Sequence, residues 1–366
     1  MIGWNAFVLL AAVNLAPAAP PPPEQVMAIP PALMQQVRQD VIDKTNSPNQ
    51  RLQLLMDLVF QSHGQQADYD PEAALRYDTA ATLTVAETWE QHRANCLSFT
   101  LLFVALARAA GLEARVQEVR QVVTWYEDQG VIYNAGHVNV GLRINGLPAT
   151  LDLDQNVLYD HHGPQPISDR RALAHFYNNR GSELLAAQQP DAAREYFRMA
   201  LQMEKNFAQA WNNLGVLENR AGDIDAALHA FDTALAFDST LPSALSNASA
   251  LYRRTGDDDH AALLAVRLQR AHDRDPFYHF IQGVQAERRN DYPAAIAHYR
   301  HAIRLYPGAH QFQFGLARAY SLNGDNRRAT KALERARALG DNERVRAVYQ
   351  AKLNMLRTLT ARHQVH

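Results

Sequence analysis

A pattern of small and apolar positions repeats every 34 residues from about residue 174 to the neighbourhood of residue 340. Small residues let two antiparallel helices approach closely, and aromatic residues fill the groove toward the next unit, so this period predicts stacked helix pairs. Five units keep one phase without an insertion. The positions that share the period are Gly181, Gly215, Ser249 and Gly283 in the first helix, Ala193, Ala227, Ala261 and Ala295 in the second, and the aromatic residues Phe197, Phe231 and Tyr299.

The third unit departs most from this pattern, because Ala265 and Leu268 stand where an aromatic residue and an alanine are expected. After the fifth unit, a further segment carries apolar residues at helical spacing. A stack of repeats leaves its last apolar face open, and a terminal helix can cover that face. We therefore assign residues 169–343 to five repeats and residues 344–366 to a capping helix and tail, with the apolar stripe Val345, Val348, Leu353 and Leu356.

Residues 24–168 lack the repeat and predict a domain of helices followed by a small antiparallel sheet, an α+β arrangement. Apolar runs that end at Gly or Pro predict helices, and alternating β-branched segments predict strands. Asn145-Gly146 is typical of a two-residue hairpin turn. The expected elements are two helices in residues 30–63, an apolar helix from Leu97 to Ala110, and strands in residues 114–123, 137–144 and 150–153.

The N-terminus predicts export. Residues Ala6 to Val13 are an unbroken apolar run, followed by Ala16-Pro17-Ala18 and by Pro20 to Pro23. A short apolar stretch with an A-x-A exit resembles a secretory signal whose cleavage leaves a flexible proline-rich arm. We assign residues 1–23 to this signal and arm and expect a periplasmic protein, with a cytoplasmic protein as the alternative. The sequence contains no run of 18 apolar residues, so it predicts no membrane-spanning helix.

Composition narrows the choice of function. The 366 residues are 47% hydrophobic and 20% charged, with a net charge of −2, so we expect no nucleic-acid partner. The single cysteine, Cys96, excludes an intramolecular disulfide and any multi-cysteine zinc site. His298 and His301 lie one helical turn apart, but no third ligand accompanies them. We therefore expect no metal and no cofactor.

Cys96 begins the apolar helix in the segment Asn95-Cys96-Leu97-Ser98. The N-terminal end of a helix favours a thiolate, because the partial positive charge of the helix dipole lies there. A thiolate nucleophile also needs a general acid and base. His137 begins a predicted strand, and Asp152 lies on the strand that follows the hairpin turn. A buried, inert cysteine is the alternative interpretation.

The hairpin turn allows the strand register to be predicted. If Asn145-Gly146 is the two-residue turn, Ile144 pairs with Leu147, and facing residues have numbers that sum to 291. His137 then faces Asp154, with Asp152 diagonally adjacent on the same face of the sheet. Either carboxylate could orient the imidazole, as in a Cys-His-Asp triad.

Acyl transfer by Cys96 would also need donors for the oxyanion and a cover over the cleft. The backbone N–H of Cys96 is the natural donor for an oxyanion, with side chains of Gln91, His92 and Asn95 as further candidates. The segment 124–135 could cover the cleft. It contains the aromatic residues Trp125, Tyr126 and Tyr133.

A Cys that opens the helix "NCLSFTLLFVALARAAGL", a His on a strand about forty residues later and an Asp on the next strand resemble the transglutaminase-like, papain-related family. The 34-residue repeats resemble tetratricopeptide repeats. The resemblance implies an α+β transglutaminase-like domain followed by an all-α tetratricopeptide-repeat solenoid. It also implies Cys96 as nucleophile, His137 as base and Asp152 as the orienting acid.

Two functions follow as expectations. The first is a thiol-dependent acyl-transfer enzyme, a cysteine peptidase, amidase or transglutaminase, whose repeats bind a protein or peptide. The second is a protein-interaction scaffold in which the transglutaminase-like domain is inactive. The reactivity of Cys96 separates the two.

Overall fold

The computed structural model describes the chain except residues 1–18, 61–74, 120–121, 124–126, 129–130, 133–136, 154–157, 160–162, 341–342 and 364–366. The predicted signal segment and the aromatic residues proposed as a cover over the cleft, Trp125, Tyr126 and Tyr133, therefore lie outside the described residues. No helix in the described part of the chain is long and apolar enough to cross a membrane.

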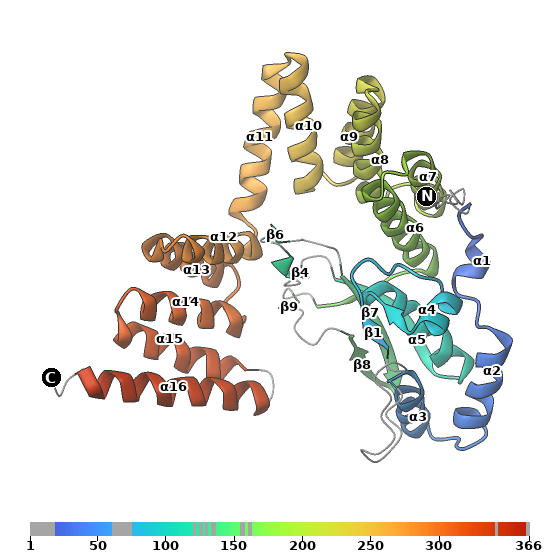
Figure 1. The fold of residues 1–366 in the computed structure, drawn as a ribbon, viewed down its shortest axis with the longest axis horizontal. Helices are drawn as coiled ribbons and strands as arrows, with labels where there is room; N and C mark the ends of the chain where they lie inside the picture. The colour runs from blue at the N-terminus through green and yellow to red at the C-terminus, as the bar shows by residue number, and fades with distance from the viewer. Residues whose placement is uncertain are drawn as a thin grey trace, which may run out of the picture.

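Helices precede the sheet in the N-terminal domain, as predicted (Figure 1). The break expected near residue 46 separates a π-helical segment from α3, and Pro48 opens α3 because proline fits the first turn of a helix. The buried helix α5 is the centre of this domain, with eleven buried residues. The helices are α1 (Pro23–Val26), α2 (Pro31–Val37), η1 (Arg38–Ile42), α3 (Pro48–Phe60), α4 (Val85–Gln91) and α5 (Cys96–Ala109).

One face of a four-stranded antiparallel sheet packs against α5. The strand order is β10-β3-β7-β8, and β7 and β8 form the hairpin across Asn145-Gly146. Its strands are β3 (Glu113–Val119), β7 (His137–Ile144), β8 (Leu147–Leu151) and β10 (Gln165–Pro166). Three two-stranded pairs complete the β structure: β1 (Arg76–Tyr77) with β2 (Arg93–Ala94), β4 (Val122–Val123) with β9 (Leu158–Tyr159), and β5 (Glu127–Asp128) with β6 (Val131–Ile132).

The predicted hairpin register is confirmed. Ile144 pairs with Leu147 and Val140 with Leu151, so facing residue numbers sum to 291. Pro148 takes part in the pairing opposite Arg143. Strand β8 ends at Leu151, although the same register would allow the pairing with β7 to continue.

Five antiparallel helix pairs and a final helix follow; in Figure 1 they rise from α6 to α11 and then descend through α12 to α16. The pairs are α6 (Asp169–Ala186) with α7 (Pro190–Met203), α8 (Ala208–Ala221) with α9 (Ile224–Phe237), α10 (Pro242–Thr255) with α11 (Asp258–Asp273), α12 (Pro276–Arg288) with α13 (Tyr292–Leu305), and α14 (His310–Leu322) with α15 (Asn326–Leu339). The last helix is α16 (Glu343–His363).

The small residues of the repeat make room for the aromatic ring of the paired helix. A Cβ atom added at Gly215 would lie 2.6 Å from the ring of Phe231, and one at Gly283 would lie 2.6 Å from Tyr299. The third helix pair has a different contact at this position, because it lacks the aromatic ring. Ser249 can be larger because Ala265 replaces the ring, and its hydroxyl donates a 2.8 Å hydrogen bond to the carbonyl of Ala261.

Helix α16 packs against α15 and covers the end of the last repeat. Leu353 is fully buried and Leu356 nearly so, as the predicted stripe requires. Val348, however, is 48% exposed, and Tyr349 is buried in its place. The prediction for Val348 was wrong because the buried stripe of α16 shifts by one residue, where a ring reaches His310.

The hydrophobic core does not end at residue 168. Buried residues from Val26 to Ala210 form one cluster, which joins the N-terminal domain to the first repeat. The hydroxyl of Tyr177 on α6 donates a 2.6 Å hydrogen bond to the carbonyl of Pro21. Residues 19–23, expected to belong to a flexible arm, are therefore anchored on the first repeat.

Candidate thiol site

Cys96 is the first residue of α5 and is partly buried. The helix begins there because the side-chain oxygen of Asn95 accepts a 2.9 Å hydrogen bond from the backbone N–H of Ser98. The hydroxyl of Thr100, one turn further along, donates to the carbonyl of Cys96 at 2.7 Å and approaches that of Val138 at 3.4 Å. The first turn of α5 is thus held against β7, the strand that His137 begins.

His137 and Asp152 meet as the register predicts. A 2.7 Å hydrogen bond joins Nε2 of His137 to Oδ2 of Asp152, just beyond the end of β8. The amide of Asn139 donates to the same carboxylate oxygen at 3.2 Å. Asp154 lies outside the described residues. Sequence reasoning missed Asn139, although its spacing of two from His137 puts both side chains on one face of the strand.

Burial and charge act in opposite directions on His137, which is 1% exposed. Burial lowers the pKa of His137, but hydrogen bonding and negative charge from Asp152 and Cys96 outweigh it and raise that pKa to about 10. The other ring nitrogen, Nδ1, is buried and has no hydrogen-bond partner of ordinary geometry. Cys96 is nevertheless near enough to act on the charge of the ring. The arrangement favours a positively charged imidazolium beside Cys96.

The side chain of Asn95 makes two hydrogen bonds at the start of α5. Its amide nitrogen donates a 2.8 Å hydrogen bond to the hydroxyl of Thr82, while its oxygen caps α5. Asn95 therefore caps α5, and one of its two amide N–H groups is already bonded to Thr82. Gln91 is exposed at the end of α4, and the ring of His92 lies beside Trp89, with centroids 5.9 Å apart.

A chain of hydrogen bonds leads from this cap to the first repeat. Oε1 of Glu183 on α6 accepts a 3.1 Å hydrogen bond from the backbone N–H of Thr82. The hydroxyl of Thr82 accepts from Asn95, the residue that precedes Cys96. Glu183 is held in turn by Arg180 at 3.0 Å. No sequence signal could identify this contact, because 101 residues separate Glu183 from Thr82.

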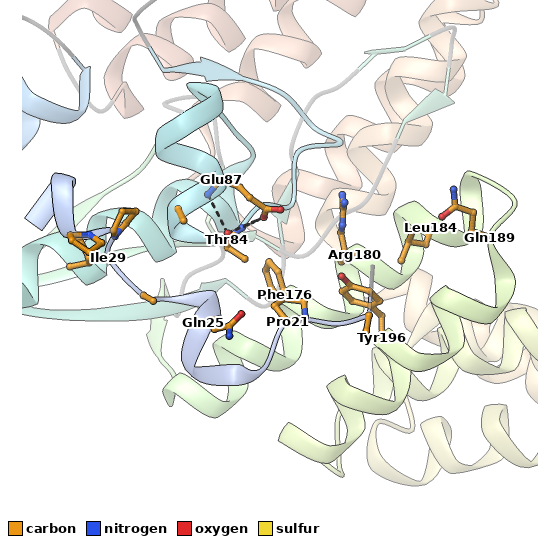
Figure 2. A pocket seen from close by; sticks show the side chains of 15 residues that line it. Pro21, Gln25, Ile29, Thr84, Glu87, Phe176, Arg180, Leu184, Gln189 and Tyr196 are labelled. Carbon is orange, nitrogen blue, oxygen red and sulfur yellow. Dashed lines mark hydrogen bonds between the residues drawn. The ribbon is translucent and has the colours of Figure 1, made fainter. Parts of the chain in front are cut away.

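A pocket of about 630 Å³ lies at the same junction, between the N-terminal segment, α4 and the helices α6 and α7 (Figure 2). Arg180 and Tyr196 line it from the repeat side, and Thr84 and Glu87 line it from the N-terminal domain. The dashed lines in Figure 2 mark the hydrogen bonds between Thr84 and Glu87 that cap α4. Arg180 thus connects this pocket to Glu183 and to the cap of α5.

The histidines considered as metal ligands lie in the fourth repeat. The ring of His301 stacks on that of His279, with centroids 3.8 Å apart and 14° between the planes. Nitrogen lone pairs lie in the plane of an imidazole, so stacked parallel rings do not direct them toward one point. Among the described residues, no group of three or more His, Cys, Asp or Glu could hold a metal ion. A second histidine pair in the sequence, His161-His162, lies outside the described residues.

Comparisons with known families match both parts of the chain. A model of the transglutaminase-like superfamily matches residues 35–150, which include Cys96 and His137 and end before Asp152. Tetratricopeptide-repeat models match residues 178–242, 251–310 and 286–353. No curated protein matches the sequence.

Solved structures resemble the helical part. MamA residues 41 to the end from Desulfovibrio magneticus RS-1 is 19% identical, with a TM-score of 0.26, over 47% of this chain and 96% of the other. YrrB, a tetratricopeptide-repeat protein with an unusual peptide-binding site, is 15% identical, with a TM-score of 0.26, over 49% and 92%. A thermophilic repeat protein of Thermus thermophilus is 20% identical, with a TM-score of 0.27, over 49% and 98%.

Proposed function

Because the chain carries a transglutaminase-like domain followed by tetratricopeptide repeats, we propose that it is a thiol-dependent acyl-transfer protein whose repeats hold a protein or peptide. Cys96 is the nucleophile, His137 the general acid and base, and Asp152 the group that orients the imidazole. The observation that carries the proposal is the 2.7 Å hydrogen bond between His137 and Asp152, beside a cysteine at a helix N-terminus.

The proposed reaction begins with attack of the Cys96 thiolate on an amide carbonyl carbon. A carbon–sulfur bond forms, and the oxyanion is met by the backbone N–H at the start of α5. His137 gives its proton to the leaving nitrogen as the carbon–nitrogen bond breaks, which leaves an acyl-thioester. Water or an amine then gives a proton to His137 and attacks the thioester carbon, and the carbon–sulfur bond breaks to release the Cys96 thiolate. Water yields peptidase or amidase action, and an amine yields crosslinking.

Alkylation of Cys96 by iodoacetamide across pH tests the thiol site. Cys96 is the only cysteine, so the signal is unambiguous. A thiolate paired with His137 reacts well below pH 8, and His137→Ala removes that advantage because the imidazolium is gone. A matched control is His260→Ala, which changes a histidine on the exposed surface of the third repeat. Slow alkylation below pH 8 that His137→Ala leaves unchanged would favour the inactive scaffold.

The binding role of the repeats is supported by a row of asparagine side chains along α6, α8 and α10. Asn213 donates to Asn178 at 2.9 Å, and Asn247 donates to Asn212 at 2.9 Å. Primary amides can both donate to and accept from a peptide backbone. Panning a displayed random-peptide library against the protein tests this role. The double variant Asn213→Ala and Asn247→Ala should lose the selected peptides, and Asn326→Ala on α15 should retain them.

Export remains part of the proposal, on the apolar run Ala6 to Val13 and the Ala16-Pro17-Ala18 exit. Expression of the full chain in a bacterium with two membranes, followed by fractionation and N-terminal sequencing, tests it. Protein in the periplasm with a new N-terminus near residue 19 supports export. Full-length protein confined to the cytoplasm overturns it.

A further inference from the structure

Positive charge gathers in the last two repeats, although the whole chain has a net charge of −2. Between Tyr292 and Leu339 there are eight Lys and Arg residues and only two Asp and Glu residues. Helices α13 and α14 contain no acidic residue at all. This excess of positive charge is a property of one part of the solenoid, since the remainder of the chain is acidic.

Three of these arginines surround one small pocket. It has a volume of about 230 Å³ and lies between α13, α14 and α15. Two of the arginines are one helical turn apart on α13, and the third comes from α15. The lining residues are Arg300, Ile303, Arg304, Gln313, Leu316 and Arg335.

None of the three guanidinium groups has an ion-pair or hydrogen-bond partner in the described part of the chain. Neighbouring arginines do pair where an acid is present. Arg318 on α14 bonds the carboxylate of Glu287 at 2.6 Å, and Arg328 on α15 pairs with Asp325 at 3.2 Å. All three arginines are exposed, so water solvates their charges, and their guanidinium groups are accessible to an anion at the pocket.

Gln313 provides a second, independent indication of a ligand. Its side chain lines the pocket and is only 4% exposed, yet its amide makes no hydrogen bond to any described residue. Its amide atoms are not sealed from solvent, so the amide is open to the pocket that it lines. An anion in the pocket would accept a hydrogen bond from the amide nitrogen.

We propose that this pocket binds an oxyanion, a phosphate or carboxylate group, held by Arg300, Arg304 and Arg335 and by the amide of Gln313. The planar guanidinium fork matches both groups, and its charged hydrogen bonds are the strong ones. Ile303 and Leu316 limit the space around the charge, so the pocket takes one anionic group. The site is separate from Cys96 and does not depend on the proposed acyl transfer.

Calorimetric titration of the full chain with inorganic phosphate, and separately with glutarate, at constant ionic strength tests the proposal. Arg304→Gln and Arg335→Gln should each weaken binding by about 10-fold or more, because each removes charged hydrogen bonds. Gln313→Leu should weaken it while keeping the packing. Arg327→Gln is the matched control, since Arg327 is exposed on the same helix as Arg335 and does not line the pocket.

The two ligands distinguish the source of the anion. Tighter binding of phosphate assigns the pocket to a phosphate group, and tighter binding of glutarate assigns it to a carboxylate. Thermal melting of each variant verifies that it is folded. Absence of binding of both ligands overturns the proposal. So does an equal loss in Arg327→Gln and Arg335→Gln, because this would show diffuse attraction to a basic surface in place of a defined site.

Discussion

Glu183 on the first repeat helix accepts a 3.1 Å hydrogen bond from the backbone N–H of Thr82, whose hydroxyl holds the cap of the Cys96 helix. The first repeat therefore completes the support of the thiol site. Burial raises the pKa of Glu183 against the lowering effect of its hydrogen bonds to Thr82 and Arg180. The carboxylate is retained in a buried position at a cost, which fits a role in fixing local geometry.

Replacing Glu183 by Ala should destabilise the N-terminal domain and slow the alkylation of Cys96. The change leaves the buried N–H of Thr82 without an acceptor, at about 1–3 kcal/mol. Urea unfolding measures the first effect and iodoacetamide kinetics the second. Glu183→Gln is the control, because its carbonyl oxygen can still accept from Thr82. Unchanged alkylation in a destabilised Glu183→Ala protein would refute the link to Cys96.

Replacing Gly215 by Leu should destabilise the solenoid by about 1–3 kcal/mol, because a well-packed site cannot take the added volume without strain. Even a Cβ atom at this position would lie 2.6 Å from the ring of Phe231. Thermal unfolding of the full chain measures the loss. Ser249→Leu is the matched change in the third repeat, where Ala265 leaves room, and should cost less. Similar melting of Gly215→Leu and the wild type would contradict the repeat phase.

Replacing Asp152 by Asn should lower the pKa of His137, because the carboxylate is one of the groups that raise it to about 10. In the wild type, protonation of His137 contributes stability that is fully present below pH 6.5 and is lost as the pH rises toward 10. The variant should lose this contribution at lower pH. An NMR titration of the His137 ring measures the change. A wild-type ring that titrates near 6.5 would refute the ion pair.

Acid should weaken the junction between the N-terminal domain and the first repeat, because Glu118 on β3 contributes to it as a carboxylate. Burial raises the pKa of Glu118, but His175 and Arg171 outweigh burial and lower it to about 2. A lowered carboxyl pKa contributes stability above 4.5 that is lost as the pH falls toward 2, at most about 3 kcal/mol. Urea unfolding of wild type and Glu118→Gln should differ at pH 7 and converge near pH 2. A constant difference over that range would disprove this contribution.

The turn residues and the strand register predicted the contact between His137 and Asp152, the two residues of the thiol site that the hairpin connects. Asn145-Gly146 sets the register, and the register brings Asp152 diagonally against His137. The sequence also predicted that the apolar helix begins at Cys96, but not that Asn95 caps it. The amide of Asn95 was one of three candidate side-chain donors for the oxyanion, and one N–H group of that amide is bonded to Thr82. The sequence could not show this hydrogen bond, because Thr82 reaches Asn95 only after the chain folds.

By itself, the sequence determined the repeat architecture, since a 34-residue period with glycine facing an aromatic ring admits close helix packing in one phase only. It also determined the hairpin that joins His137 to Asp152. The tertiary structure alone decided that the first repeat shares the core of the N-terminal domain, that Glu183 supports the Cys96 helix, and that three arginines converge around Gln313. The repeat period and the hairpin register describe contacts between segments that are close together along the chain. These contacts join separate helices and domains, whose relative positions depend on the packing of the whole chain.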